Sequence, residues 1–510
     1  MLLLMAAGQQ FNYGNKMDRN LTMATNLSHI PNWINGQEAQ PADNRWLDKF
    51  NPHSGELLCY VADSSATDTQ DAITAAGNAF SLWSELTPVK RGQILSDIVA
   101  SMKRRSKELA DCIALETGKP LQDAKGEVGG GILQAEYFSG EGMRLYGRSL
   151  TSGTPGKHSH TVRQPRGIAG LIVPANTPIA NICWKTFPAL ICGNTVVLKA
   201  AEDSPHIANL FAQLVKEAGL PDGVFNVVQG RGESAGAALV EDSRVAVISF
   251  TGSTNVGRWI AEVAGKRLAR ISLELGGKNS LVVCDDADLD QAVHWASLSA
   301  FSNAGQRCAS GSRVLVFKDI YDSFRDKFVA KAKSLKLGVS AGCDLGPVIN
   351  KRQQLNILSA IETAKVEGGR VLCGGAAPTN QEMSNGYYVQ PTVIEGLQRS
   401  AELSCKEVFG PVATLHPVED LADALKLANS TDYGLTAAIH TRSVDRAMWF
   451  AQRVRAGVVN INIGTFGSEP HMPFGGFGAS GNGTREPGVE ALDVYSELKN
   501  ISFLVRDTLI

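Results

Sequence analysis

From residue 67 to residue 146, apolar side chains recur every three to four positions, with polar side chains between them. This spacing places the apolar side chains on one face of a helix. Thr67 and Thr87 stand at candidate N-cap positions, and Gly118-Lys-Pro120 marks a helix end followed by a new start. The pattern therefore predicts an all-helical segment of three long elements, over residues 68–83, 87–117 and 120–146.

Beyond residue 166 the apolar positions form short continuous runs, most of them separated by a helix-length segment. Strands that are buried on both faces of a parallel sheet show such runs. The first series occupies residues 167–173, 195–198, 224–228 and 245–250, and the second occupies residues 280–283, 313–317, 412–415 and 458–461. The chain is thus predicted to be α/β, with two doubly wound parallel-sheet domains that face each other across a cleft near residue 274.

The N-terminal part of the chain follows neither pattern. The apolar run over residues 1–7 lacks the basic flank and the cleavage site of a signal peptide, so we expect residues 1–28 to be a disordered leader. Residues 32–66 alternate short apolar runs with glycine, proline and asparagine, which predicts hairpins at the edge of a domain.

The charged residues narrow the range of partners. The 510 residues include 49 basic and 51 acidic side chains, spread along the chain, for a formal net charge of -2. Binding to nucleic acid or to an anionic membrane requires a basic surface, which this balance does not provide. We therefore expect a small-molecule partner, with no nucleic acid and no membrane.

The nine cysteines and nine histidines are dispersed along the chain. An odd number of cysteines without a Cys-x-x-Cys pair argues against a disulfide framework and against a zinc site. The histidines show no spacing typical of metal ligands. We expect no metal, a reducing compartment and a cytoplasmic location.

One cysteine stands in a small, polar, glycine-containing loop, Asn303-Ala-Gly-Gln-Arg-Cys308-Ala-Ser-Gly-Ser-Arg313. Gly305 allows the backbone to approach a ligand closely, and the charge of Arg307 favours the thiolate form of Cys308. The loop predicts a reactive thiol. A buried structural cysteine at a loop end is equally compatible with the loop alone.

Two other polar side chains are candidates for chemistry. Glu274 lies inside the apolar stretch Leu273-Glu-Leu-Gly-Gly-Lys278, where burial would raise the pKa of its carboxyl group toward that of a general base. A structural salt bridge to Lys278 is the alternative. Asn176 lies between two prolines at the end of the first strand, where its amide can donate to an oxyanion or simply form a turn.

Two further places are suited to a dinucleotide. The turn at Gly252 and Ser253 joins a buried strand to a helix, whose N-terminus offers free N–H groups to a phosphate. Lys199 and Glu202 follow the second strand, where a dinucleotide fold binds the adenosine ribose. Glu202 would repel a 2'-phosphate and so favours NAD over NADP. A plain helix cap and a solvated loop pair are the respective alternatives.

Together these stretches resemble the aldehyde dehydrogenase superfamily, from about residue 32 to the C-terminus. The resemblance is specific because several motifs occur in the family's order. They are Pro174-x-Asn176-x-Pro, Trp184-Lys185, Gly193-Asn-Thr-Val-Val-x-Lys199, Phe250-Thr-Gly-Ser, Leu273-Glu-Leu-Gly-Gly-Lys, Gly305-Gln-x-Cys308, Glu407-x-Phe409-Gly-Pro and Pro473-Phe-Gly-Gly.

The resemblance implies NAD(P)-dependent oxidation of an aldehyde to its acid through a cysteine thiohemiacetal and a thioester. Cys308 would be the nucleophile, and Glu274 would activate the water that hydrolyses the thioester. Asn176 and the backbone N–H of Cys308 would form the oxyanion hole. Lys185 and Glu486 resemble the family's proton-relay pair.

The resemblance also assigns the cofactor contacts and leaves two other functions open. Lys199 and Glu202 would hold the adenosine ribose, Ser253 the pyrophosphate and Glu407 the nicotinamide ribose, while Phe409 would pack near the nicotinamide. The alternatives are an aldehyde dehydrogenase that acylates coenzyme A, and a non-catalytic binding or structural member of the same fold. The presence of Glu274 argues against the first, because that branch often lacks this base.

Some residues depart from the family pattern. The sequence Pro174-Ala-Asn-Thr-Pro178 lacks the two bulky aromatic residues usual there, and Gly478 replaces a frequent lysine. Trp184 stands where enzymes for succinate semialdehyde tend to have an arginine, which argues against that substrate. Glu469 and His471 lie in a loop expected to line the substrate entrance, and they hint at a polar or amine-bearing substrate.

The resemblance further implies domain boundaries and an oligomer. A β-arm near residues 158–167 and a C-terminal strand near residues 500–505 would assemble a homodimer or homotetramer. We expect a Rossmann-like dinucleotide-binding domain at 29–147 and 167–273, a catalytic domain at 274–485, and the oligomerisation arm and C-terminal strand at 148–166 and 486–510.

Overall fold

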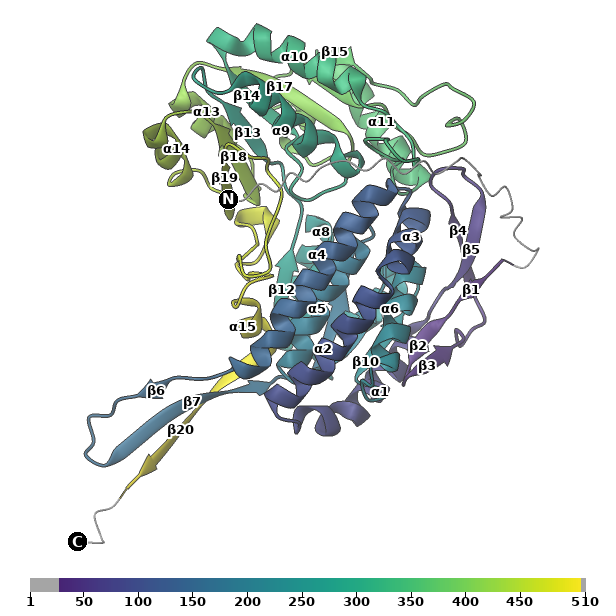
Figure 1. The fold of residues 1–510 in the computed structure, drawn as a ribbon, viewed down its shortest axis with the longest axis vertical. Coiled ribbons are helices and arrows are strands. Elements are labelled where there is room, and N and C mark those ends of the chain that lie inside the picture. Colours follow the sequence, from purple (N-terminus) through teal and green to yellow (C-terminus); the bar gives the residue numbers. More distant parts are fainter. Residues whose placement is uncertain (1–26, 506–510) are drawn as a thin grey trace, which may run out of the picture.

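The computed structural model describes residues 27–505, so the predicted leader falls almost entirely outside the described residues. Two seven-stranded sheets dominate the structure, and helices pack on both faces of each (Figure 1). The prediction of an α/β fold with two doubly wound sheets is therefore confirmed. Among residues 27–505, none of the helices is both long and apolar enough to span a bilayer.

The first sheet has the strand order β12-β11-β8-β9-β10-β2-β3. Its strands are β2 (Asn32–Ile34), β3 (Gln37–Ala39), β8 (Ile168–Ile172), β9 (Thr195–Lys199), β10 (Phe225–Val228), β11 (Val245–Thr251) and β12 (Arg270–Glu274). The central strands are parallel, whereas β2 and β3 pair antiparallel at one edge. All four predicted strands of the first series are present, and the predicted edge hairpin is β2–β3.

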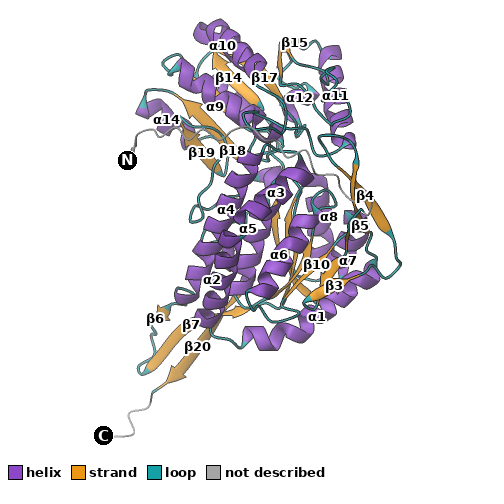
Figure 2. Cartoon of the chain, turned by 45° about the vertical axis from the view of Figure 1, so that its right-hand side comes forward, coloured by secondary structure: helices purple, strands orange, loops and turns teal. Residues whose placement is uncertain are grey.

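Helices on the two faces of this sheet are α1 (Ala66–Ser84), α2 (Pro88–Arg104), α3 (Ser106–Thr117), α4 (Leu121–Gly140), α5 (Pro178–Ile191), α6 (Pro205–Glu217), α7 (Ala237–Glu241) and α8 (Thr254–Gly265). Alternate side chains of each strand point to opposite faces. In β9, Val196 and Leu198 pack with α5 and α6, whereas Val197 packs with α1, α7 and α8. Helices α2, α3 and α4 lie outside α5 and α6 (Figure 2).

The second sheet has the order β15-β16-β17-β14-β13-β18-β19. Its strands are β13 (Ser280–Val283), β14 (Arg313–Phe317), β15 (Arg370–Cys373), β16 (Thr392–Glu395), β17 (Val412–Val418), β18 (Thr436–His440) and β19 (Val458–Ile461). The helices of this half are α9 (Leu289–Phe301), α10 (Tyr321–Ser334), α11 (Lys351–Val366), α12 (Glu402–Cys405), α13 (Leu421–Ala428) and α14 (Val444–Ala451). The four predicted strands of the second series are again present.

Two smaller sheets complete the fold. One joins β1 (His29–Ile30), β5 (Leu57–Ala62) and β4 (Trp46–Phe50). The other joins β6 (Ser149–Leu150), β7 (Lys157–Pro165) and β20 (Ser496–Leu504), and it projects away from the body (Figure 1). Strand β20 pairs antiparallel with β7 along its whole length, and α15 (Ala491–Tyr495) precedes it. The arm and the C-terminal strand predicted far apart in the sequence are thus one structure.

The helical prediction needs three corrections. The expected helix over 120–146 is α4, which ends at Gly140 and is followed by a 3-10 turn over Glu141–Met143. The expected helix over 87–117 is two helices, because Arg105 leaves the helical conformation at φ -102° and ψ 21°. The buried residues Met102 and Leu109 are seven positions apart, so the hydrophobic period continues across the break. The break therefore cannot be recognised from the hydrophobic pattern. The cap of α1 is Ser65, not Thr67, since the side chain of Asp68 accepts from the Ser65 N–H and closes a capping box.

Candidate active site

A cavity of about 300 Å³ lies where the first sheet meets the second half of the chain. Side chains from the carboxyl ends of β8, β11 and β12 line it, as expected for a doubly wound sheet. The structure brings seven of the predicted site residues to this cavity: Asn176, Gly252, Ser253, Glu274, Cys308, Glu407 and Phe409. Lys185, Lys199, Glu202 and Glu486 lie elsewhere.

The loop that holds Cys308 has an unusual backbone. After α9, Asn303, Ala304 and Gly305 all adopt positive φ angles, of 54°, 53° and 68°. Such a conformation is unfavourable for the two residues that carry a side chain. At Gly305 a Cβ would lie 2.1 Å from the carbonyl oxygen of Gly410, so this position requires glycine. The turn delivers Cys308 to the cavity.

The thiol of Cys308 is not activated in the structure as the loop sequence predicts. Burial, together with the carboxylates of Glu407 and Glu274, raises the pKa of Cys308 to about 12. The charge of Arg307 lowers this pKa, but it is outweighed. The guanidinium of Arg307 instead lies 4.8 Å from the ring centroid of Phe466. The charge of Arg307 therefore acts on the pKa of Cys308 in the predicted direction, but burial and the two carboxylates outweigh it.

This raised pKa makes a prediction about alkylation. Only the thiolate reacts with iodoacetamide, and its fraction rises about tenfold per pH unit below the pKa. In the cofactor-free protein, the alkylation rate of Cys308 should therefore keep rising between about pH 7 and pH 10. Mass spectrometry of the Cys308 peptide measures this rate, with the Cys405 peptide as an internal reference. A rate that levels off near neutral pH would contradict the raised pKa.

Glu274 ends β12 and is buried, with 4% of its surface exposed. Neither carboxylate oxygen has a hydrogen-bond partner among the described residues, and no Lys or Arg within residues 27–505 pairs with it. Burial raises the pKa of Glu274 well above its usual value, and the charge of Glu486 adds to this effect. The alternative of a salt bridge to Lys278 is therefore not observed. An unpaired buried carboxylate beside Cys308 is suited to a general base.

Asn176 is tied to the cysteine loop through its side chain. Its Nδ2 donates to the carbonyl oxygen of Gln306 at 2.8 Å, and its Oδ1 is buried without a partner. This orientation of the Asn176 amide follows from its partner, because the reverse orientation would place Oδ1 of Asn176 against the carbonyl oxygen of Gln306. One N–H of Asn176 is thus committed to the loop, whereas the other has no acceptor among the described residues, and Asn176 lines the cavity.

Lys185 and Glu486 form a buried ion pair behind the cavity. Lys185 Nζ lies 2.7 Å from Glu486 Oε2, and both side chains are 1% exposed. Lys185 and Glu486 both bond to the hydroxyl of Ser249, and the hydroxyl of Tyr495 donates to Glu486 at 3.2 Å. Because the charge of Glu486 acts on the pKa of Glu274, the pair lies close enough to influence it.

The predicted adenosine contacts form a second group. Lys199 Nζ lies 3.0 Å from Glu202 Oε2, so these two residues are paired as expected. Glu202 lines a separate cavity of about 640 Å³, together with Arg231, Glu233 and Arg352. The sequence analysis did not assign Arg231 or Arg352 to the cofactor site, although Arg231 lies in Gly230-Arg-Gly232, an incomplete glycine motif. Only the tertiary fold places these cations beside Glu202.

The predicted phosphate and nicotinamide contacts lie nearer Cys308. Ser253 caps the N-terminus of α8, and its hydroxyl accepts from the N–H of Val256. Glu407 accepts from the backbone of Gly277, and burial raises the pKa of Glu407 to about 7. Phe409 adopts a φ of 57° and presents its ring to the same cavity. These three residues surround the space that leads from α8 to Cys308.

The remaining wall of the cavity has both aromatic and polar side chains. Trp184 and Phe474 contact each other with ring centroids 5.6 Å apart, and Thr177 and Asn181 lie on the same wall. Glu469 and His471, in contrast, are exposed and do not line this cavity. Their predicted place at the substrate entrance stays a prediction.

All nine cysteines lie within the described residues, and none is disulfide-bonded. Within residues 27–505, no three His, Cys, Asp or Glu side chains gather closely enough to hold a metal ion.

Comparisons with known proteins agree with this fold and site. The model of the aldehyde dehydrogenase family matches residues 39–501. The alpha-ketoglutaric semialdehyde dehydrogenase of Bacillus subtilis (strain 168) is 38% identical, over 94% of this chain and 99% of that protein. Aldehyde dehydrogenase 1A1 of Rattus norvegicus is also 38% identical, over 94% of this chain and 96% of that protein.

The solved structure of betaine aldehyde dehydrogenase from Staphylococcus aureus, in complex with NAD+, superposes with a TM-score of 0.91. It is 33% identical and covers 93% of this chain and 94% of that one. By its fold and by these relatives, the protein is an oxidoreductase with two doubly wound domains. The chain belongs to the aldehyde dehydrogenase family, whose members oxidise aldehydes.

Proposed function

We propose that the protein oxidises an aldehyde to its carboxylic acid through a covalent bond to Cys308. The observation that carries this proposal is the convergence of Cys308, Glu274 and Asn176 on one cavity of about 300 Å³. The Cys308 thiol gives up its proton to solvent, and the thiolate sulfur adds to the carbonyl carbon, whose oxygen becomes the oxyanion of a thiohemiacetal. The free N–H of Asn176 and the backbone N–H of Cys308 stabilise its oxyanion. The cofactor, when bound, accepts the hydride from this adduct.

Loss of the hydride leaves a thioester on Cys308, which water must hydrolyse. Glu274 takes a proton from that water, since its unpaired carboxylate lines the same cavity. The Lys185–Glu486 pair then passes the proton toward the protein interior. A base at this place favours hydrolysis over transfer of the acyl group to coenzyme A.

The residues of the chain fit NAD(P). The N-terminus of α8, with Gly252 and Ser253, offers N–H groups to a pyrophosphate. Glu202 lines the larger cavity and Glu407 lines the cavity at Cys308, and both carboxylates provide acceptors for ribose hydroxyls. The NAD+ complex of the staphylococcal relative supports this use. We propose NAD as the preferred cofactor.

One assay tests the reaction. The purified protein is given a broad panel of aldehydes with NAD or NADP, with and without coenzyme A, and both products are quantified. We expect reduced nicotinamide and free acid in equal amounts. Acyl-coenzyme A as the main product would favour the acylating alternative. Absence of reduction with every aldehyde would favour a non-catalytic member of the fold.

The cofactor preference makes a separate prediction. A carboxylate that accepts from ribose hydroxyls contributes a factor of about 10 to 100 in binding. Glu202→Gln should therefore raise the Kd for NAD about tenfold, and it should narrow the preference for NAD over NADP. Fluorescence titration measures both constants. Glu233→Gln is the control, since Glu233 is exposed and lines the same cavity. A wild-type protein that binds NADP more tightly than NAD would overturn the assignment.

Assembly and location belong to the same proposal. The arm of β7 and β20 exposes the apolar side chains of Leu498, Ile501 and Phe503, which supports a homodimer or homotetramer. Nine free cysteines support a reducing compartment, and we propose the cytoplasm. Light scattering of the purified protein at several concentrations tests the assembly.

A further inference from the structure

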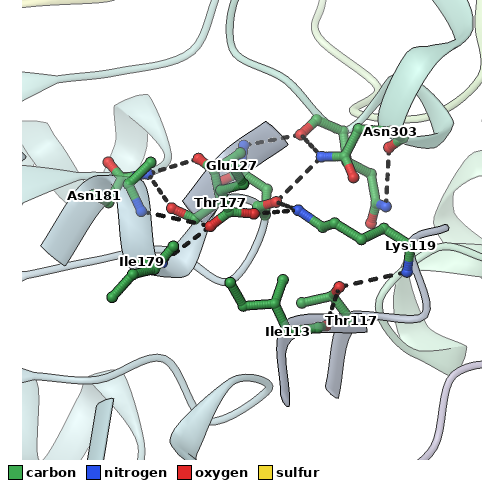
Figure 3. A network of polar contacts seen from close by, with 11 residues as sticks. Ile113, Thr117, Lys119, Glu127, Thr177, Ile179, Asn181 and Asn303 are labelled. Atoms are coloured by element: carbon green, nitrogen blue, oxygen red, sulfur yellow. Dashed lines mark hydrogen bonds and ion pairs between the residues drawn. The ribbon is translucent and has the colours of Figure 1, made fainter. Parts of the chain in front are cut away.

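A buried ion pair lies beside the cavity without lining it. Lys119 belongs to the turn between α3 and α4, and Glu127 belongs to α4. Lys119 Nζ lies 2.6 Å from Glu127 Oε2, and each side chain is 4% exposed. Figure 3 shows the Lys119 side chain extended between Glu127 and Asn303. Burying two charges costs several kcal/mol per ion and is weak evidence of a role in stability.

The lysine end of this pair reaches the candidate oxyanion hole. Lys119 Nζ also donates to the carbonyl oxygen of Asn176 at 2.7 Å. Asn303 Nδ2 donates to the same carbonyl and to the carbonyl of Gln306, at 3.2 Å each. The Asn176 side chain itself donates to the Gln306 carbonyl at 2.8 Å. These contacts tie the backbone and the side chain of Asn176 to the loop that carries Cys308.

The glutamate end of the pair holds a helix. Glu127 Oε1 accepts from the backbone N–H of Ile179 at 3.0 Å, in the first turn of α5. A carboxylate at a helix N-terminus is favourable because it meets free N–H groups and the positive end of the dipole. Helix α5 carries Asn181 and Trp184, which line the cavity, and Lys185. One ion pair therefore contacts both Asn176 and the start of α5, the helix that forms part of the cavity wall.

We propose that Lys119 and Glu127 are positioning residues for the oxyanion hole. Lys119 restrains the Asn176 carbonyl and Glu127 restrains the start of α5, so that the second N–H of Asn176 points at the oxyanion formed on Cys308. This inference rests on the proposed function. The inference gives a structural reason for the orientation of Asn176. The ion pair contacts Asn176 only through its backbone carbonyl, whereas the side chain of Asn176 contacts Gln306.

The role predicts a specific kinetic change. Lys119→Met removes the donor to the Asn176 carbonyl and keeps an unbranched side chain that is one atom shorter. A displacement of about 1 Å at a reacting centre costs about 100-fold in rate. The pre-steady-state burst of reduced nicotinamide should therefore slow by about 10- to 100-fold. With aldehyde deuterated at the carbonyl carbon, the steady-state rate should acquire a primary isotope effect, because hydride transfer becomes the slow step. The Kd for NAD should not change.

Three further variants separate positioning from general damage. Lys119→Arg keeps a charged donor and should recover most of the burst rate. Glu136→Gln, on the same helix α4, removes an exposed ion pair to Lys103 and should leave the burst unchanged. If Lys119→Met does not fold, the double variant Lys119→Met with Glu127→Gln leaves no buried charge unpaired and should show the same slow burst.

The outcomes distinguish the two proposals. A wild-type protein that reduces no nicotinamide with any aldehyde contradicts the proposed function itself. A wild-type burst that stays as fast in Lys119→Met or in the double variant contradicts the positioning role alone. The same holds if the burst keeps its wild-type rate and only the rate after the burst falls, since the first oxyanion on Cys308 then forms normally.

Discussion

Replacing Cys308 with alanine should lower the rate of aldehyde oxidation by about 10⁴-fold or more, while NAD binding remains. Removal of an essential nucleophile typically costs this much or more, because no covalent adduct can form. The residual rate would come from the oxyanion hole and from binding alone. Stopped-flow absorbance of reduced nicotinamide measures the oxidation, and fluorescence titration measures the Kd for NAD.

Two other cysteines provide matched controls for this substitution. Cys343 and Cys405 are partly exposed, as Cys308 is, and neither lines the cavity at Glu274. Alanine at either position should leave the oxidation rate within about twofold of the wild type, as for surface changes of small energy. An active Cys308→Ala variant would refute the assignment of the nucleophile.

Replacing Glu274 with glutamine should separate the two halves of the reaction. The amide cannot take a proton from water, so hydrolysis of the thioester should slow by about 10²- to 10⁴-fold. The first burst of reduced nicotinamide should persist at near the wild-type rate. Acid quenching followed by mass spectrometry should then find the acyl group on Cys308. Loss of the burst itself would show that Glu274 acts before hydride transfer.

The same residue sets a pH dependence. Burial raises the pKa of Glu274 well above its ordinary value, so the carboxylate form that acts as a base increases only as the pH rises through that raised pKa. The steady-state rate of the wild type should therefore rise with pH above neutrality. In Glu274→Gln this rise should be absent from the hydrolysis step, which single-turnover decay of the thioester measures. A rate that falls with pH over this range would contradict a base of raised pKa.

Much of the local structure could be predicted from the sequence. Continuous apolar runs such as 195–198 and 280–283 are strands because only a buried parallel sheet accommodates them. The exceptions are helix ends that the local hydrophobic pattern does not reveal. The break at Arg105 leaves the hydrophobic period intact. The guanidinium of Arg105 donates to Glu217 of α6, which is 112 residues away in the sequence.

The candidate site divides in the same way. Glu274 and Asn176 stand out in the sequence because each places a polar side chain in an apolar or proline-flanked stretch, whereas Cys308 stands out because its loop is small, polar and rich in glycine. Their chemical state does not follow from those neighbours. The pKa of Cys308 is raised by burial and by Glu407 and Glu274, while its sequence neighbour Arg307 opposes this only weakly.

By itself, then, the sequence determined which elements form and which residue types are available for chemistry, since both depend on short-range periodicity and on side-chain identity. The tertiary structure alone decided the pairing of Lys119 with Glu127, the contact of Lys119 with the Asn176 carbonyl and the protonation of Cys308. These properties depend on burial and on distances between residues that the chain brings together only when it folds.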